Sequence, residues 1–384
     1  MSIESITAEI KNLLKDITVV TDETERDDSA RENIDLFENP LDPNLLAYCF
    51  DIVLGFDVRY RIFEKVNYII EFSYKGTFAT VGHFKMSYDL SIDKRYKAEL
   101  ISIFKKVRSL LEELFMQIGE KALIDNEFSM KNETPDFFNK LTFYENKIET
   151  LKQQEQAVQA KCQGKYDVTL DEYGYTHMRQ KGSDYLRNLR TEIIYDIEAY
   201  IDTFFAALEH VLTLLYPFVC NVEPQKSYFN NYIRKTKWDW MTKIRNVFGS
   251  KLPVEIVDEL RRIKEIYRNH NAHGGFSREM MAYVQIPGFG RLPMFVGKEY
   301  LKGFINGKQD HISYDLYKDA KDVFTKFWEA LDNTFQIPMM FIRSGLAIPV
   351  DTERYTENVD TPETAQWIIN KMLYDLDNQL NMDW

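Results

Sequence analysis

The chain has 384 residues, 45% of them hydrophobic and 14% aromatic, so it is long enough for two or three domains with cores of their own. Its net charge of -12 argues against a protein that coats nucleic acid over its whole surface, because such binding requires neutralisation of phosphates, and any nucleic-acid contact must therefore be local. The three cysteines are far apart and odd in number, which supports neither a disulfide framework nor a zinc ribbon.

Two features of the sequence bear on its location. The most apolar segment, 206–219, is interrupted by Glu209, His210 and Pro217, so no membrane span is expected. The N-terminus opens with Ser2 and lacks the basic and then apolar order of a secretory signal. These features predict a soluble cytoplasmic protein that makes no membrane contact.

The first 172 residues mix helical and strand patterns. Apolar residues recur at three- and four-residue steps in segments that we predict to be helices: 3–17, 94–121 and 134–162. Aromatic and β-branched residues on both sides of Lys75-Gly76 predict two or three antiparallel strands between 68 and 92. The acidic stretch 21–42 is typical of a solvated linker. We therefore expect an N-terminal α+β region over 1–172 with a regulatory or sensing role.

The rest of the chain reads as helical, which makes the predicted fold mostly α with a smaller α+β region at the N-terminus. An irregular segment over 166–178 marks the expected boundary. Beyond it lie four predicted helices: 184–216, 238–248, 253–267 and 314–335. Pro217 is expected to end the first helix, and a loop or β-hairpin over 276–308 is inserted before the fourth. We predict a helical bundle over 173–337, and coil followed by a helix from Thr361 over 338–384.

One short stretch is chemically unusual. Arg268-Asn269-His270-Asn271-Ala272-His273 closes the third predicted helix of the bundle and is followed by Gly274-Gly275, which favours a loosened helix end. There Arg268 and His273 can converge on one phosphate, the arginine through two parallel donors and the histidine by proton transfer. Cations at a helix C-terminus also favour the macrodipole, which is the alternative that requires no catalysis. His270 and His273 have no carboxylate or cysteine partner and make a weak metal signature, so neither metal nor cofactor is expected.

The charge around this stretch differs from that of the whole chain. The segment from Lys226 to Arg268 contains eleven Lys or Arg and five Asp or Glu, so its net charge is 11 - 5 = +6. Such a local excess is the footprint expected of an RNA-facing patch. Within it we predict RNA contacts by Lys243, Arg245 and Lys264, together with His270. Nearby aromatic residues either stack RNA bases or pack in a core or dimer interface: Tyr228, Phe229, Tyr232, Trp238 and Trp240.

The stretch resembles a known motif. An arginine, a polar residue, three further residues and a histidine, at the end of the third helix of a predicted four-helix bundle, are similar to the Arg-x4-6-His motif of the HEPN superfamily (higher eukaryotes and prokaryotes nucleotide-binding domain). The run from Trp238 through Leu252-Pro253 into Tyr267-Arg268-Asn269 is also similar. The resemblance covers 184–335 and says nothing of the N-terminal region.

The resemblance implies a metal-independent endoribonuclease. Arg268 and His273 would be catalytic and Asn269 would support them, with the motifs of two protomers in one composite cleft. The implied reaction is attack of an RNA 2′-hydroxyl on the adjacent phosphate. Family members that are paired with nucleotidyltransferase antitoxins carry a tyrosine two positions after the histidine, where this chain has Gly275, so the resemblance does not extend to that mode of regulation.

The implied biology is that of a homodimeric toxin or anti-phage abortive-infection effector, controlled by a regulatory partner or trigger. The alternative is a catalytically silent HEPN-fold module that binds nucleotide or RNA or mediates dimerisation. A third hypothesis is an enzyme whose cleft is blocked by the N-terminal region or by a partner. Deletion of the N-terminal region separates the second hypothesis from the third.

Overall fold

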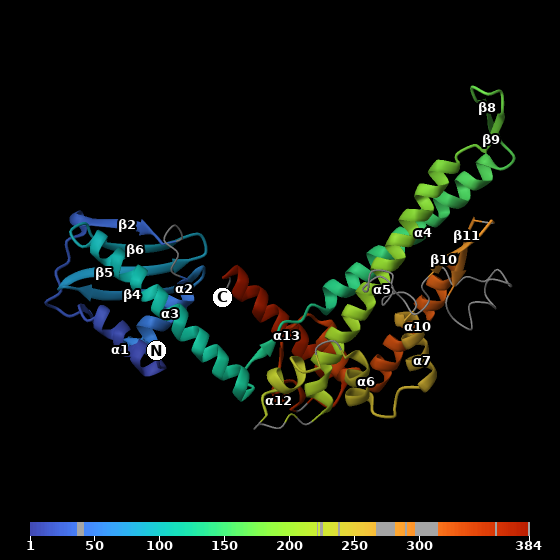
Figure 1. The fold of residues 1–384 in the computed structure, drawn as a ribbon. Helices are drawn as coiled ribbons and strands as arrows, with labels where there is room; N and C mark the ends of the chain where they lie inside the picture. The colour runs from blue at the N-terminus through green and yellow to red at the C-terminus, as the bar shows by residue number, and fades with distance from the viewer. Residues whose placement is uncertain are drawn as a thin grey trace. The chain divides into compact units, whose positions relative to one another are not determined.

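A computed structural model describes residues 1–36, 42–220, 222, 226–236, 239–265, 281–288, 290–295, 314–357 and 359–382. The chain is mostly helical, with a sheet near its N-terminus, as predicted (Figure 1). It forms two compact units. The first comprises Met1–Phe128, Glu223–Asn231 and Gln366–Trp384, and the second comprises Ser129–Val222 and Tyr232–Ala365.

The first unit is built on an antiparallel sheet of order β1-β4-β5-β6-β2, with β3 paired to β4. Its strands are β1 (Ile17–Thr18), β2 (Arg31–Asp35), β3 (Tyr60–Phe63), β4 (Val66–Tyr74), β5 (Thr77–Phe84) and β6 (Tyr88–Asp93). The expected hairpin is confirmed, because Lys75 and Gly76 join β4 to β5 with positive φ at both residues. Alternation along β4 directs Tyr68, Ile70 and Phe72 into one buried face.

Helices cover the buried face of this sheet. They are α1 (Ile3–Leu13), α2 (Pro43–Tyr48), which leads into a π-helical turn at Cys49–Val53, and α3 (Lys97–Asp125). In α3 the buried residues Leu100, Phe104, Val107 and Leu111 follow the helical period that predicted it. The predicted helix over 3–17 is shorter than expected, because Ile17 pairs with Tyr74 in the sheet.

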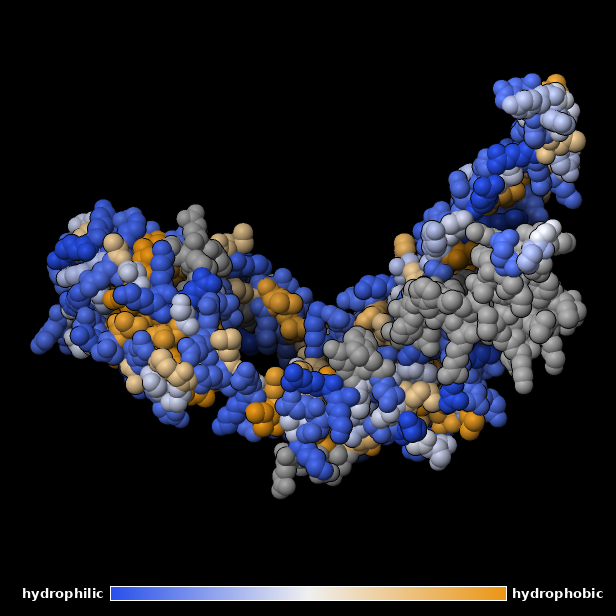
Figure 2. Space-filling view, viewed as in Figure 1, coloured by the Kyte–Doolittle hydropathy of each residue, from blue (hydrophilic) through white to orange (hydrophobic). Residues whose placement is uncertain are grey.

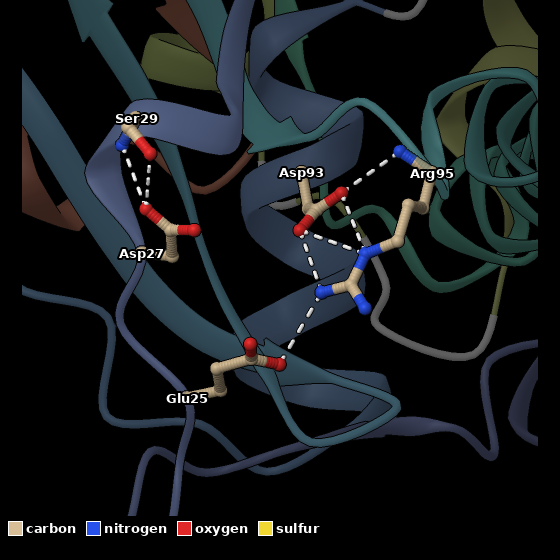
Figure 3. A network of polar contacts seen from close by, with 5 residues as sticks. All are labelled: Glu25, Asp27, Ser29, Asp93 and Arg95. Carbon is tan, nitrogen blue, oxygen red and sulfur yellow. Dashed lines mark hydrogen bonds and ion pairs between the residues drawn. The ribbon is translucent and has the colours of Figure 1, made fainter.

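The acidic stretch 21–42 was wrongly predicted to be a solvated linker. Within it β2 pairs with β6 at the edge of the sheet, where Ile34 is buried. Figure 3 shows the polar contacts nearby: Asp93 accepts hydrogen bonds from the backbone N–H of Arg95 at 2.8 Å and from its guanidinium, which also reaches Glu25 at 3.3 Å. The hydrogen bonds to Arg95 hold the pKa of Asp93 below its usual range. Ladder bonds and ion pairs offset the low apolar content on which the prediction rested.

The second unit begins with two long helices that pack against each other, α4 (Thr134–Cys162) and α5 (Ser183–Val219). Between them the chain forms the hairpin of β8 (Tyr166–Leu170) and β9 (Thr176–Gln180), at the far end of the helical pair (Figure 1). The expected irregular boundary over 166–178 is therefore a paired hairpin, and residues 129–172 belong to the second unit. Gly174, with φ of +81°, supplies the turn that the sequence suggested was irregular.

Further helices surround the C-terminal half of α5: α6 (Trp240–Phe248), α7 (Val254–Ile263), α10 (Tyr314–Thr334) and α11 (Gln336–Arg343). α5 packs against α6, α10 and α11, and α10 packs against α7. Phe204 of α5 stacks on Phe324 of α10 with ring centroids 3.4 Å apart. Pro217 lies inside the last turn of α5, which continues to Val219, so it does not end the helix as predicted. Because Pro217 lies so close to the C-terminus of α5, its missing N–H costs the helix only one hydrogen bond.

Two regions complete the second unit. The predicted insertion contains the hairpin of β10 (Met281–Ile286) and β11 (Gly290–Phe295). The predicted coil after Pro338 instead contains most of α11, then β12 (Ile348–Pro349), which pairs with β7 (Ser129–Met130), and α12 (Glu353–Thr356). Pro338 sits in the first turn of α11, where its missing N–H is tolerated. The last helix, α13 (Pro362–Asn381), belongs to the first unit from Gln366 onward. It begins as expected, with Thr361 accepting from the Thr364 N–H at 3.2 Å.

Candidate functional site

The predicted catalytic residues Arg268, Asn269 and His273, and the predicted RNA contact His270, lie outside the described residues. The structure describes the chain before that stretch up to residue 265, which includes α7. Lys264 continues the backbone of α7 in the right-handed helical conformation, four residues before Arg268 in the chain. The surroundings of Lys264 therefore define what anchors the approach to the motif.

Lys264 points into the unit and contacts α5 and α6. Its Nζ lies 3.9 Å from a carboxylate oxygen of Glu209, and the two side chains are only 15% and 8% exposed. The same ammonium lies over the rings of Trp240 at 5.0 Å and Phe205 at 5.5 Å. A cation held by one carboxylate and two aromatic faces is fixed in place, because each contact strengthens when water is excluded. Lys264 thus ties the end of α7 to α5 and α6.

Lys243 of α6 lies beside this contact. Its side chain is buried, and its ammonium donates a hydrogen bond to the hydroxyl of Thr213 at 3.0 Å. Burial lowers the pKa of Lys243, against the opposing pull of Glu209 and Asp239. Lys243 was predicted as an RNA contact, but in this position it does not present its charge on the surface. The charge count along the sequence could not reveal this, because it takes no account of burial.

Arg245 lies two residues after Lys243 on α6 and is exposed. Its guanidinium contacts the hydroxyl of Thr242 at 3.4 Å, and its Nε points to the Met241 carbonyl at 3.5 Å. Asp239 caps α6 by accepting from the Thr242 backbone N–H at 3.0 Å, and its hydrogen bonds to Thr242 lower its pKa. The structure therefore pairs Lys264 with Glu209, buries Lys243 beside that contact and leaves Arg245 on the surface.

Of the aromatic residues near the patch, Trp238 lies outside the described residues, Phe229 is half-buried, and the other three belong to cores. Trp240 is buried against Phe205 with ring centroids 5.7 Å apart, and Tyr228 and Tyr232 are also buried. Of the two interpretations given above, core packing holds for these three. Their hydrophobic area stabilises the helices instead of stacking bases.

Glu209 is the residue whose importance sequence reasoning missed. Two acidic residues of α5, Glu209 and Asp196, are buried. Asp196 accepts a hydrogen bond from Lys147 at 3.0 Å. A signal existed for Glu209, since it interrupts the most apolar segment of the chain, and a carboxylate in such a segment is retained only with a cationic partner.

Within the described ranges, no group of three or more His, Cys, Asp or Glu residues is arranged to hold a metal ion. Among these same residues, no helix combines the length and apolarity needed to cross a membrane. Comparison with protein-family models, with curated proteins and with solved structures found no match to this chain.

Proposed function

We propose that this protein is a metal-independent endoribonuclease of the HEPN type. The observation that carries the proposal is the combination of Arg268 and His273, spaced five residues apart and closed by two glycines, in the segment that follows α7. It is supported by the fixed position of Lys264, which anchors the end of α7 on buried Glu209. Helices α5, α6, α7 and α10 then serve as the HEPN-like bundle.

The proposed reaction follows from the chemistry of the two side chains. An RNA 2′-hydroxyl loses its proton to a histidine base and attacks the adjacent phosphorus, while the bond from phosphorus to the 5′-oxygen breaks. The leaving oxygen takes up a proton, which gives a 2′,3′-cyclic phosphate and a 5′-hydroxyl end. His273 transfers protons and Arg268 stabilises the charge that builds on the phosphate, with Asn269 supporting them.

As the resemblance implies, two copies of the chain bring their motifs together in one composite cleft. Arg245, which is exposed, contacts the RNA backbone around this cleft together with His270. The first unit, with its separate sheet and core, serves as the sensing or restraining part of a cytoplasmic toxin or anti-phage abortive-infection effector. This role rests on the habit of the resembling family.

The test incubates the purified full-length protein with RNA in EDTA and compares Arg268→Ala and His273→Ala with wild type. We expect each variant to lose roughly 100-fold or more of the cleavage rate. Arg262→Ala is the matched control, since it removes an arginine of α7 that pairs with Glu259 at 2.8 Å, and we expect it to retain activity. Cleavage that needs metal or survives both variants overturns the proposal, and RNA binding without turnover favours the silent binding module.

A further inference from the structure

The hairpin of β8 and β9 has two chemically different faces. Its register places Val168 opposite Met178, Tyr166 opposite Gln180 and Leu170 opposite Thr176, all on one face because side chains alternate along each strand. The other face carries the pairs Asp167 with Arg179 and Thr169 with His177. The hairpin is thus an amphipathic two-stranded ribbon.

The apolar face of this ribbon is exposed to solvent. Exposed fractions of its large side chains are 55% for Tyr166, 60% for Val168, 72% for Leu170 and 66% for Met178. Figure 2 shows hydrophobic residues on the surface at this end of the unit. Among the described residues, each strand has only the other as its sheet partner. A lone two-stranded ribbon is marginally stable in water unless its apolar face is covered.

The ribbon is joined to its support by an ion pair between Arg179 of β9 and Asp184 of α5. Asp171 closes the turn by accepting from the backbone N–H groups of Tyr173 at 3.0 Å and Tyr175 at 2.8 Å, and its other oxygen contacts His177 at 2.9 Å. Below the ribbon, buried Glu155 of α4 binds Arg190 of α5 at 2.6 Å. The hydrogen-bonded turn and the ion-paired helices hold the apolar face in one orientation, which suits binding to a surface of fixed shape.

Charge and area select the occupant of this face. Over 163–182 the charges are Lys165, Arg179 and Lys181 against Asp167, Asp171 and Glu172, which gives 3 - 3 = 0. A hairpin with no net charge and aliphatic side chains on one face fits neither the phosphates of RNA nor a strongly charged partner, but it lets two copies of an acidic chain meet without repulsion. With the tip residues Tyr173 and Tyr175, the ribbon exposes on the order of 600 Å² of apolar surface, so two ribbons bury roughly 1,200 Å², enough for a specific contact.

We propose that the apolar face of the β8–β9 hairpin packs against the same face of a second copy of this chain, in a two-fold, tip-to-tip interface. This interface is separate from the pairing of bundles that the proposed ribonuclease requires. It stands on the geometry of the hairpin and does not depend on RNA cleavage. Because both contacts are isologous, a chain that uses both assembles beyond a dimer, and loss of one contact reduces the assembly to the dimer made by the other.

The test is the mass of the full-length protein in solution, by light scattering and sedimentation velocity over a range of concentrations. Val168→Asp places a carboxylate at the centre of the apolar face, and Thr169→Asp places the same charge one residue away on the polar face. We expect Val168→Asp to weaken self-association by about 100-fold or more and to halve the assembly, because each interface then buries two unpaired carboxylates. Thr169→Asp and Arg268→Ala leave the mass unchanged.

A second measurement guards against a variant that fails to fold. Val168→Cys is expected to give cross-linked dimers with a bis-maleimide reagent, whereas Thr169→Cys is not. A wild-type monomer at every concentration, or an equal mass for Val168→Asp and wild type, overturns the proposal. It is also overturned if Val168→Asp loses RNA binding while its mass is unchanged, since that assigns the ribbon to nucleic acid.

Discussion

Replacement of Glu209 by glutamine tests whether the buried carboxylate anchors the end of α7. Glu209→Gln keeps the shape of the side chain but removes the buried carboxylate beside Lys264 and Lys243. Removal of one partner from a buried ion pair costs about 3–5 kcal/mol. The side chain of Lys264 keeps 15% exposure and lies 3.9 Å away, so we place the loss at the lower end, about 3 kcal/mol.

Two comparison variants sharpen this test. Lys243→Met removes a buried charge and one hydrogen bond to Thr213, whose hydroxyl still donates to the Glu209 carbonyl at 2.8 Å, so we expect a change of about 1 kcal/mol or less. Glu192→Gln, on the exposed side of α5, costs under about 0.5 kcal/mol because Lys147 retains Asp196. The assay is urea unfolding followed by tryptophan fluorescence. The reasoning is refuted if Glu209→Gln is no more damaging than Glu192→Gln, or if Lys243→Met costs as much as Glu209→Gln.

Three further predictions concern the framework. Burial lowers the pKa of His210, whose Nε2 accepts a hydrogen bond from the backbone N–H of Glu133, just before α4, at 3.0 Å. The folded chain therefore protonates His210 less readily than the unfolded chain does, so we expect the melting temperature to fall as the pH drops below 6.5. The fall should be less steep in His210→Gln. Tyr200→Phe loses the hydrogen bond to Glu145 at 2.8 Å and should cost about 1–2 kcal/mol in urea unfolding. Gly249 has φ +57° and ψ -118°, a backbone conformation that strains other residues, so Gly249→Ala should cost about 1–3 kcal/mol of stability. Gly119 lies inside α3 with open space around it, so Gly119→Ala should stabilise the fold by about 0.5–1 kcal/mol. Equal effects of the two substitutions would contradict this account.

Local chemistry made much of the fold predictable. Short-range periodicity of apolar residues predicts α3, α4 and α10, and turn residues predict the glycine turn between β4 and β5. The errors arose where long-range pairing supplies what composition lacks. Strand β2 is acidic yet holds an edge of the sheet, and the pair β12–β7 joins segments more than two hundred residues apart. No local pattern encodes such partners.

The surroundings of the motif show a similar division. Lys243, Arg245 and Lys264 count equally as positive charges along the chain, but the packing of α5, α6 and α7 buries the first, encloses the last between Trp240 and Glu209, and exposes only Arg245. Burial depends on which helix faces meet, which the spacing within one helix does not determine. The motif itself remains a prediction from its residues and its resemblance.

The chemical identity of the RNA ends tests the central proposal most directly. Full-length protein is incubated with a defined RNA in EDTA, and the products are analysed by mass spectrometry and by their susceptibility to a 5′-kinase. The proposed mechanism predicts 2′,3′-cyclic phosphate and 5′-hydroxyl ends, which are absent with Arg268→Ala and His273→Ala. Ends that carry a 5′-phosphate, or products that form only when a divalent metal is added, would contradict it.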